Sequence, residues 1–169
     1  CMRRILVIGN GGAGKSTLSR AVGQMLSLPV VHLDRLWWLP GWVNRTAEEF
    51  DALLSKELAK PAWIMDGNYR RTFSWRLRYA DFCAVLDVDD ETCLCNAKER
   101  AEKYAGRSRP DMADGCIERV ADDFVEWIGQ YREKVLPEML DILKESGVPY
   151  RVFSSSAQAE KWFAETCEK

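Results

Sequence analysis

A short glycine-rich segment limits the fold of this chain more than any other feature. Residues 9–17 read GNGGAGKST, and they follow an apolar run over residues 4–8 and open a helical pattern over residues 15–26. Glycines allow a tight turn whose N–H groups point inward, and the N-terminus of the following helix adds a partial positive charge. The pattern GxxxxGK[ST] between a strand and a helix therefore predicts a loop that binds the phosphates of a nucleotide.

The side chains of this loop predict which atoms bind the nucleotide. Lys15 can reach the β- and γ-phosphates, and the hydroxyl of Ser16 can ligate Mg²⁺. We therefore expect ATP and Mg²⁺ as cofactors, with GTP left open as the donor. The residues expected to bind the nucleotide are Gly9, Gly11, Gly12, Ala13, Gly14, Lys15, Ser16 and Thr17.

Two other interpretations of the segment are weaker. A glycine-rich turn that binds nothing would need the whole pattern to arise by chance, which happens in well under about one in fifty chains of this length. Gly9, Gly11 and Gly14 also fit the GxGxxG pattern of dinucleotide-binding proteins. However, Lys15 and Ser16 complete the phosphate-loop pattern, and no ribose-binding carboxylate at the usual distance is distinctive.

The composition is that of an ordinary globular protein. The chain has 169 residues, of which 47% are apolar and 30% charged, and this length predicts one domain over residues 1–169. A net charge of -2 gives no overall field that would attract a polyanion. The six cysteines and the one histidine lack the paired spacing of a zinc site, and in a chain of this size free thiols are expected.

The N-terminal residues give no sign of a targeting segment. The apolar run over residues 5–8 is too short for a signal peptide or a membrane span, so we expect a cytoplasmic protein with no membrane partner. Met2 is the expected native start, and Cys1 is left out of the functional argument.

Short β-rich runs alternate with longer helical patterns, which is typical of a parallel sheet covered by helices. The strands are expected at Arg4–Ile8, Val30–Leu33, Ala62–Met65, Phe82–Val88 and Tyr150–Phe153. The helices are expected at Lys15–Leu26, Thr46–Ala59, Asp90–Tyr104 and Cys116–Val135, and after the capping residues Ser154–Ser156. Thr46 and Glu49 form a capping box at the start of the second helix, and Pro137 is expected to kink or divide the fourth. The sequence therefore predicts an α/β fold, a three-layer α/β/α sandwich with a five-stranded parallel sheet and the first strand at its centre.

Three aspartates lie at or near the ends of expected strands. Asp34 ends the second strand, Asp66 the third, and Asp87 lies within the fourth. Ligands collect at the carboxyl ends of parallel strands, where one carboxylate can hold a Mg²⁺ water and another can orient or deprotonate an acceptor hydroxyl. One such aspartate alone is more often a turn or capping residue, but two beside a phosphate loop favour a functional site. Asp87 is expected to be structural or secondary, because Asp89 indicates the turn into the next helix.

The segment around Asp66 resembles a known family. Residues 63–72 read WIMDGNYRRT and are similar to the third strand of the adenylate kinase-like P-loop kinases, where Asp-Gly ends an apolar strand and an arginine follows. Together with LDRLWWLPGW (33–42) and GRSRPDM (106–112), this segment resembles the bacterial DNA topology modulation proteins. The resemblance implies a P-loop fold of the nucleotide and shikimate kinase type, and an enzyme that transfers a phosphoryl group from ATP.

The same resemblance implies roles for individual residues. Lys15 and Ser16 would lie at the donor phosphates and the magnesium ion. Asp66 would hold a magnesium water, and Arg70 would contact a phosphate. A short lid is implied over about residues 105–113, where closing arginines would neutralise the charge of the transition state and exclude water. The catalytic residues expected on this basis are Lys15, Asp34, Arg100, Arg107 and Arg109.

The acceptor side departs from the adenylate kinase pattern. A proline expected before the arginine is absent, and Asn68 and Tyr69 stand in its place, so AMP is not assumed as the acceptor. Asp34 is more similar to the carboxylate that meets the acceptor hydroxyl in shikimate and gluconate kinases. The residues expected to bind a small-molecule acceptor are Asp34, Arg35, Trp38, Asp66, Asn68 and Arg70. The tryptophans of the same region either stack on the acceptor or pack the loop against the next helix, and these are Trp37, Trp38 and Trp42.

A basic cluster leaves a second function open. The cluster consists of Arg70, Arg71, Arg76 and Arg78, with Tyr69, Phe73, Trp75 and Tyr79 interleaved. Such a mixture can bind single-stranded nucleic acid through phosphate pairing and stacking, which fits a nucleotide-dependent regulator associated with DNA. The negative net charge and the position of the cluster beside the acceptor residues favour the kinase, with DNA as the less favoured partner.

Overall fold

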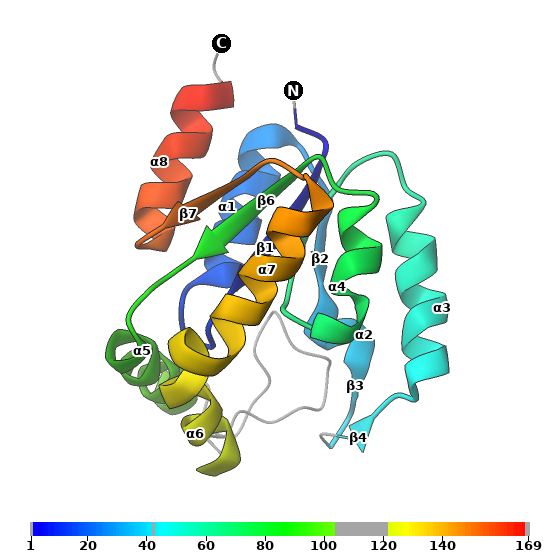
Figure 1. Ribbon diagram of the computed structural model, residues 1–169. Helices are drawn as coiled ribbons and strands as arrows, with labels where there is room; N and C mark the ends of the chain where they lie inside the picture. Colours follow the sequence, from blue (N-terminus) through cyan, green and yellow to red (C-terminus); the bar gives the residue numbers. More distant parts are fainter. Residues whose placement is uncertain (1, 42, 104–121, 168–169) are drawn as a thin grey trace.

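The computed structural model describes residues 2–41, 43–103 and 122–167, and a five-stranded parallel sheet forms its centre (Figure 1). The strands are β1 (Arg4–Gly9), β2 (Val30–His32), β5 (Trp63–Asp66), β6 (Phe82–Leu86) and β7 (Tyr150–Phe153). Their order across the sheet is β2-β5-β1-β6-β7, so the first strand is central, as predicted. The ends of each strand lie within two residues of the predicted ends.

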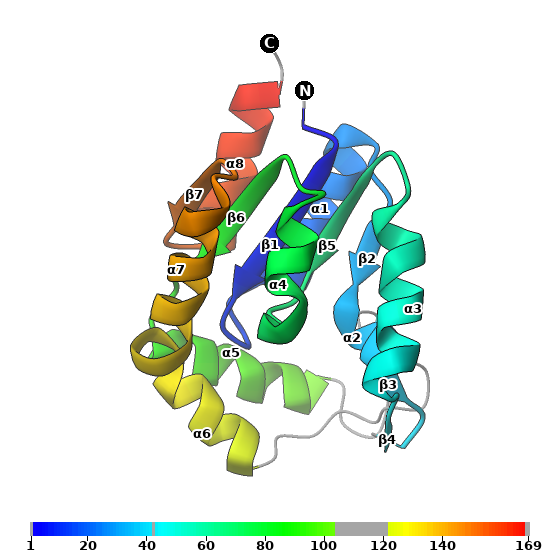
Figure 2. The ribbon, with the colours of Figure 1, turned by 45° about the vertical axis from the view of Figure 1, so that its right-hand side comes forward.

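Helices cover both faces of the sheet and give the predicted three layers (Figure 2). One face carries α1 (Lys15–Leu26) and α8 (Ser156–Cys167), and the other carries α3 (Ala47–Leu58), α4 (Arg70–Leu77) and α7 (Leu136–Ser146). Alternate side chains of β1 point to opposite faces, so Ile5 and Val7 pack in one core whereas Leu6 and Ile8 pack in the other. A parallel strand buried on both faces has a continuous apolar sequence, which is why the sequence indicated it.

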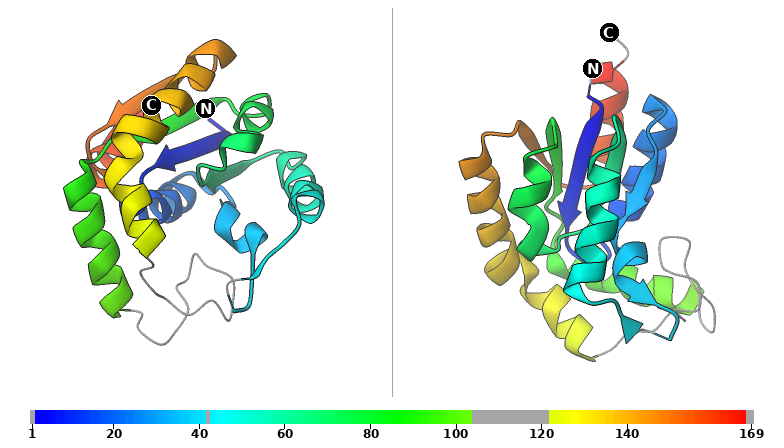
Figure 3. Two further views of the ribbon diagram at one scale, coloured as in Figure 1. Left: turned by 60° about the horizontal axis from the view of Figure 1, so that its bottom comes forward. Right: turned by 90° about the vertical axis from the view of Figure 1, so that its right-hand side faces the viewer.

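Two further helices lie at the carboxyl end of the sheet (Figure 3). They are α5 (Asp90–Lys103) and α6 (Asp122–Gln130). A π-helical turn, η1 (Tyr131–Val135), joins α6 to α7, and Pro137 lies in the first turn of α7. The predicted long helix is therefore divided close to Pro137, as expected. Its predicted portion over residues 116–121 lies outside the described residues.

The helix starts predicted from capping residues are confirmed. Thr46 Oγ1 accepts a hydrogen bond from the N–H of Glu49 at 3.1 Å, and its hydroxyl donates to Glu49 Oε1 at 3.1 Å. Ser155 Oγ accepts from the N–H of Gln158 at 3.1 Å at the start of α8. The N–H groups of Glu49 and Gln158 have no partner inside their helices, and these two hydroxyl oxygens supply one.

The sequence did not predict the short elements around the acceptor side. After β2 the chain forms α2 (Leu33–Trp37) and an antiparallel hairpin of β3 (Trp38–Leu39) and β4 (Val43–Asn44). The predicted second strand is thus one residue too long, and Asp34 lies in the first turn of α2 instead of at the end of a strand. Helix α4 was also not predicted, because two of its four buried side chains, Thr72 and Arg76, are polar, so its apolar residues alone show little helical periodicity.

The thiols of the described residues form no disulfide, as expected. The free cysteines are Cys83, Cys93, Cys95 and Cys167, and the other two, Cys1 and Cys116, lie outside the described residues. Burial raises the pKa of Cys83 to about 12 and that of Cys93 to about 11, so neither is a nucleophile near neutral pH. Within residues 2–41, 43–103 and 122–167, no helix is long and apolar enough to span a membrane.

Candidate active site

The phosphate loop lies between β1 and α1 and is held by its own asparagine. Asn10 O accepts a hydrogen bond from Lys15 Nζ at 3.0 Å, and Asn10 Oδ1 accepts from the N–H of Gly11 at 2.8 Å. The Nδ2 of this fully buried side chain donates to Asp90 Oδ1 at 3.0 Å and to Ile128 O at 2.8 Å. Asn10 therefore ties the loop to α5 and α6. The motif leaves this position variable, so the sequence gave no signal for its role.

Gly12 fixes the loop closely against α5. Its φ is 78°, and a Cβ added there would lie 2.1 Å from Cys93 O. Asn96 Nδ2 donates to Gly12 O at 3.0 Å from the same helix. Only glycine fits both this backbone conformation and this space.

The N-terminus of α1 is suited to a phosphate group. Gly14 precedes the helix, no side chain caps it, and its first turn contains no acidic residue. The first N–H groups of a helix have no internal partner, and the helix dipole favours an anion beside them. The amine of Lys15 lies on the same loop, where it contacts Asn10 O. These features fit the nucleotide phosphates that the sequence predicts.

Asp66, predicted to serve the magnesium ion, is buried at the carboxyl end of β5 beside His32. The two residues are register partners in neighbouring strands, and His32 Nδ1 lies 2.5 Å from Asp66 Oδ2. Among the described residues, Asp66 Oδ1 has no hydrogen-bond partner. A carboxylate oxygen of this kind is the donor that Mg²⁺ prefers, so Asp66 fits the predicted role. This contact depends on the pairing of β2 with β5, so the sequence offered His32 only as a candidate zinc ligand and gave no signal for it.

Asn68, predicted to bind the acceptor, joins the phosphate loop to the rest of the site. Its Nδ2 donates to Gly9 O at 2.7 Å, and its Oδ1 accepts from the N–H of Gly9 at 3.3 Å. Tyr131 in η1 donates from its hydroxyl to the same Oδ1 at 2.8 Å. These three hydrogen bonds fix the side-chain amide of Asn68. They also hold the segment after β5 beside the start of the phosphate loop.

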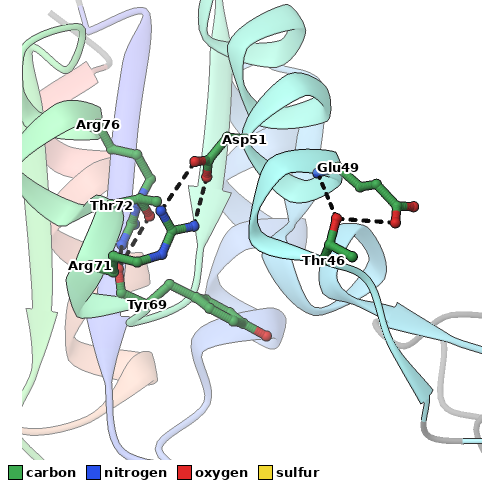
Figure 4. Close-up of polar contacts among 7 residues, drawn as sticks. All are labelled: Thr46, Glu49, Asp51, Tyr69, Arg71, Thr72 and Arg76. Atoms are coloured by element: carbon green, nitrogen blue, oxygen red, sulfur yellow. Dashed lines mark hydrogen bonds and ion pairs between the residues drawn. The ribbon is translucent and has the colours of Figure 1, made fainter.

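Arg76 is a charged residue of the basic cluster that the structure buries completely. Its guanidinium donates to Gly67 O at 3.2 Å and to Asn68 O. It also donates to Tyr69 O at 3.1 Å, and its Nε donates to Thr72 Oγ1 at 3.2 Å (Figure 4). Burial lowers the pKa of Arg76 to about 10, which leaves it protonated at neutral pH. The side chain therefore holds the backbone after β5 and is not available to bind nucleic acid.

Asp34 accepts a hydrogen bond from the hydroxyl of Tyr69. Burial, reinforced by the charge of Asp34, raises the pKa of Tyr69 well above its usual range, so the phenol stays protonated and donates. The Tyr69 ring stacks on Phe50 with centroids 5.3 Å apart, and it lies 6.2 Å from the ring of Trp37. The carboxylate predicted to meet the acceptor is thus oriented by a half-buried tyrosine from the segment that follows β5.

The tryptophans of the acceptor segment differ in their surroundings. Trp37 packs edge-on against Phe50 of α3, with ring centroids 5.5 Å apart. Of the two predicted roles for the tryptophans, Trp37 therefore has that of packing against the next helix. Trp38 is half-buried in β3, where its register partner is Asn44. Arg35, predicted beside them, is exposed on α2. Trp42 lies outside the described residues.

The other predicted arginines are dispersed. Arg70, expected at a phosphate, pairs with Glu138 of α7 at 2.7 Å, and both side chains are exposed. Arg71 binds Asp51 of α3 through two nitrogens, at 2.7 and 3.1 Å (Figure 4). Arg100 lies in α5. Arg107, Arg109 and the predicted lid over about residues 105–113 lie outside the described residues.

One further arginine, which the sequence did not single out, forms an ion pair at the carboxyl end of β6. Arg132 in η1 donates from Nε to Asp87 Oδ1 at 2.7 Å, at the carboxyl end of β6, and this carboxylate raises the pKa of the guanidinium. Asp89 accepts from the N–H of Thr92 at 2.8 Å and so caps α5, as its spacing predicted. Asp87 therefore has a structural ion pair, in agreement with its predicted secondary role.

No protein-family model matches the sequence, and no curated protein matches it. Solved structures match the fold. Shikimate kinase from Bacteroides thetaiotaomicron is similar with a TM-score of 0.63 and 19% identity, over 99% of this chain and 98% of that one. Shikimate kinase from Acinetobacter baumannii in complex with shikimate gives 0.60 at 14% identity, over 99% and 91%. The YorR protein from Bacillus subtilis in complex with phosphorylated GDP gives 0.58 at 13% identity, over 98% and 95%.

These matches span nearly the whole of each chain and establish the fold. The chain has the P-loop α/β fold of the shikimate kinase type, which confirms the predicted fold class. The resemblance to DNA topology modulation proteins is not confirmed by them.

Proposed function

We propose that this chain is an ATP-dependent kinase that transfers the γ-phosphoryl group to the hydroxyl of a small acceptor. The observation that carries the proposal is the placement of two acidic residues beside a phosphate loop. Asp66 ends β5, the strand next to β1, and Asp34 lies in the first turn of α2, which follows β2 on the other side of β5. Asn68, two residues after Asp66, is hydrogen-bonded to Gly9 at the start of the loop. One carboxylate thus lies near the donor and the other on the acceptor side.

Each of these residues has a chemical role in the proposal. The loop N–H groups and Lys15 bind the donor phosphates, and Ser16 and Asp66 would hold Mg²⁺ directly or through its water. The ion, when bound, would supply positive charge that offsets the negative charge of the donor phosphates. Asp34 accepts the proton of the acceptor hydroxyl as the oxygen bonds to the γ-phosphorus and ADP leaves. Arginines from α5 and the predicted lid, namely Arg100, Arg107 and Arg109, would neutralise the transferring group.

The acceptor is proposed to be a small alcohol rather than a nucleoside monophosphate. Asp34 accepts a hydrogen bond from the Tyr69 hydroxyl, which fixes the orientation of the carboxylate proposed to meet the acceptor hydroxyl. Two of the similar structures are shikimate kinases, one of them in complex with shikimate, and this supports an alcohol acceptor. Arg70, which would grip a phosphate on the acceptor, pairs with Glu138 instead.

The test is an assay of acceptor-dependent phosphate transfer. The protein is incubated with ATP and MgCl₂ and with a panel of small alcohols and nucleoside monophosphates, and ADP and phosphorylated products are measured by mass spectrometry. We expect transfer to at least one alcohol. Lys15→Ala should lower kcat at least about a hundredfold, because it removes a charge aimed at the transition state, while the fold is retained. Lys161→Ala, on the exposed surface of α8, is the matched control.

A DNA-associated regulator that only hydrolyses nucleotide slowly is the alternative. The basic cluster favoured it, but Phe73 and Arg76 are buried, and Arg70 and Arg71 are paired with acidic residues. Slow hydrolysis without transfer across the panel, together with salt-sensitive binding of single-stranded DNA, would favour this alternative.

A further inference from the structure

The contact between His32 and Asp66 has a chemistry that the proposed roles do not use. The two side chains are 9% and 6% exposed, and 2.5 Å separates Nδ1 from Oδ2. At that distance a proton lies between the two atoms. With Asp66 as the carboxylate that the proposed magnesium role requires, the donor is His32 Nδ1–H. His32 is the only histidine of the chain.

The second oxygen of this buried carboxylate points to a ligand. Among the described residues, neither Asp66 Oδ1 nor His32 Nε2 has a hydrogen-bond partner. Neither atom is among the fully buried side-chain atoms that lack a partner, so each keeps some accessible surface at which a water or a ligand can supply the missing hydrogen bond. Asp66 is the register partner of Val7, two residues before Gly9, where the phosphate loop begins. Its free oxygen is therefore close to the place proposed for the nucleotide's magnesium ion.

We propose that His32 is a positioning residue for Asp66 in the binding of Mg²⁺ with the nucleotide. By donating to Oδ2, the imidazole fixes the rotation of the carboxylate and leaves Oδ1 to accept from a magnesium-bound water. Groups that orient metal-binding side chains in this way typically change metal affinity about ten- to a hundredfold when removed. The inference rests on the proposed binding of a magnesium nucleotide, but it does not require that phosphate is transferred.

The test measures the affinity for ATP by isothermal titration calorimetry, with excess Mg²⁺ and with EDTA. His32→Leu removes the donor, whereas His32→Asn keeps one, because the Asn amide nitrogen lies near the place of Nδ1. We expect His32→Leu and Asp66→Asn to reduce the gain in affinity that Mg²⁺ gives by about tenfold or more. His32→Asn should reduce it by less than about threefold, and affinity in EDTA should be the same in all variants.

A double variant distinguishes positioning from an independent role. If His32 acts only through Asp66, His32→Leu/Asp66→Asn should lose no more of the Mg²⁺ effect than Asp66→Asn alone. His32→Leu leaves the buried Asp66 carboxylate without its partner, which can prevent folding. The double variant has no such charge, so it can be measured even if His32→Leu does not fold. Asp81→Asn is the matched control, because Asp81 binds the N–H of Arg3 at 2.9 Å at the opposite end of the sheet.

Three results would overturn the inference. They are an equal loss in His32→Asn and His32→Leu, additive losses in the double variant, and an unchanged Mg²⁺ effect in Asp66→Asn. If the proposed function is wrong but this inference is right, the experiments give a different result. No acceptor is phosphorylated, yet the gain in ATP affinity from Mg²⁺ is still reduced in His32→Leu and kept in His32→Asn.

Discussion

The donor and acceptor sides of the candidate site are held in different ways. On the donor side, Asn10 is fully buried, and Gly12 leaves no space for a side chain against α5. On the acceptor side, Asp34 and Trp38 are half-buried on short elements. A loop fixed by buried contacts suits a ligand of constant shape, such as a triphosphate, whereas short half-exposed elements can differ between kinases without disturbing the core. If the chain is the kinase proposed above, the choice of acceptor would depend on α2 and the β3–β4 hairpin.

The two sides meet in the three residues after β5. Gly67, Asn68 and Tyr69 all present carbonyls to the guanidinium of Arg76. The side chain of Asn68 contacts the donor loop, whereas that of Tyr69 contacts Asp34. A disturbance at this junction should therefore affect both sides at once, whereas changes elsewhere should affect one.

The largest effect is expected from Arg76→Met, which keeps most of the apolar stem and removes every donor. Its partners are three backbone carbonyls and Thr72, all left without this charge-assisted donor. We expect the free energy of unfolding to fall by about 3–5 kcal/mol, measured by urea denaturation, because several buried acceptors lose their donor at once. Arg78→Met, an exposed neighbour in sequence, should change it by less than about 0.5 kcal/mol. Equal effects of the two substitutions would show that the junction does not depend on the buried charge.

Two glycines with the same φ of 78° compare the packing of the two sides directly. A Cβ at Gly12 would lie 2.1 Å from Cys93 O, whereas a Cβ at Gly41 would meet nothing within 4 Å. Gly41→Ala should cost about 1 kcal/mol of unfolding free energy, from the left-handed backbone alone. Gly12→Ala adds a clash with backbone and should cost about 3 kcal/mol. It should also weaken ATP binding, which Gly41→Ala should not do. Similar costs for both would mean that the donor loop is no more tightly packed than the hairpin.

Asp34→Asn tests whether the acceptor side contains the base. With a hydroxyl acceptor, we expect kcat to fall about a hundredfold while the Kd for ATP changes little, because the amide cannot take the proton. Tyr69→Phe removes only the hydrogen bond to Asp34 and should lower kcat by less. A kcat that is nearly unchanged in Asp34→Asn would instead indicate an acceptor whose phosphate is gripped by Arg35 and Arg70.

The donor side and the sheet were predictable because their signals are local. Each strand is a buried apolar run, and the loop Gly9–Thr17 carries its chemistry in consecutive residues. The contact of His32 with Asp66 was not predictable in the same way, because it exists only through the pairing of β2 with β5. The arginines of the basic cluster look alike in sequence, yet Arg76 is buried whereas Arg71 forms an ion pair on the surface. Arg76 can be buried because the tertiary fold places backbone carbonyls around its guanidinium. The spacing of residues in the sequence does not indicate where such carbonyls lie.

The smallest effect on stability is expected at Arg70, and it sharpens the comparison on the acceptor side. Arg70 and Glu138 form an exposed ion pair at 2.7 Å, and such pairs contribute about 0.2–1 kcal/mol. Arg70→Gln should therefore leave the unfolding free energy within this range of the wild type. If the acceptor is an uncharged alcohol, its KM should change by less than about threefold, because no phosphate on the acceptor needs the guanidinium. Glu138→Gln is the control, since it breaks the same pair but leaves the arginine in place. The opposite result would be a rise of about tenfold in the KM for the acceptor in Arg70→Gln that is absent in Glu138→Gln. It would mean that Arg70 leaves Glu138 to bind a negatively charged acceptor. The acceptor side would then recognise phosphate, as the donor side does.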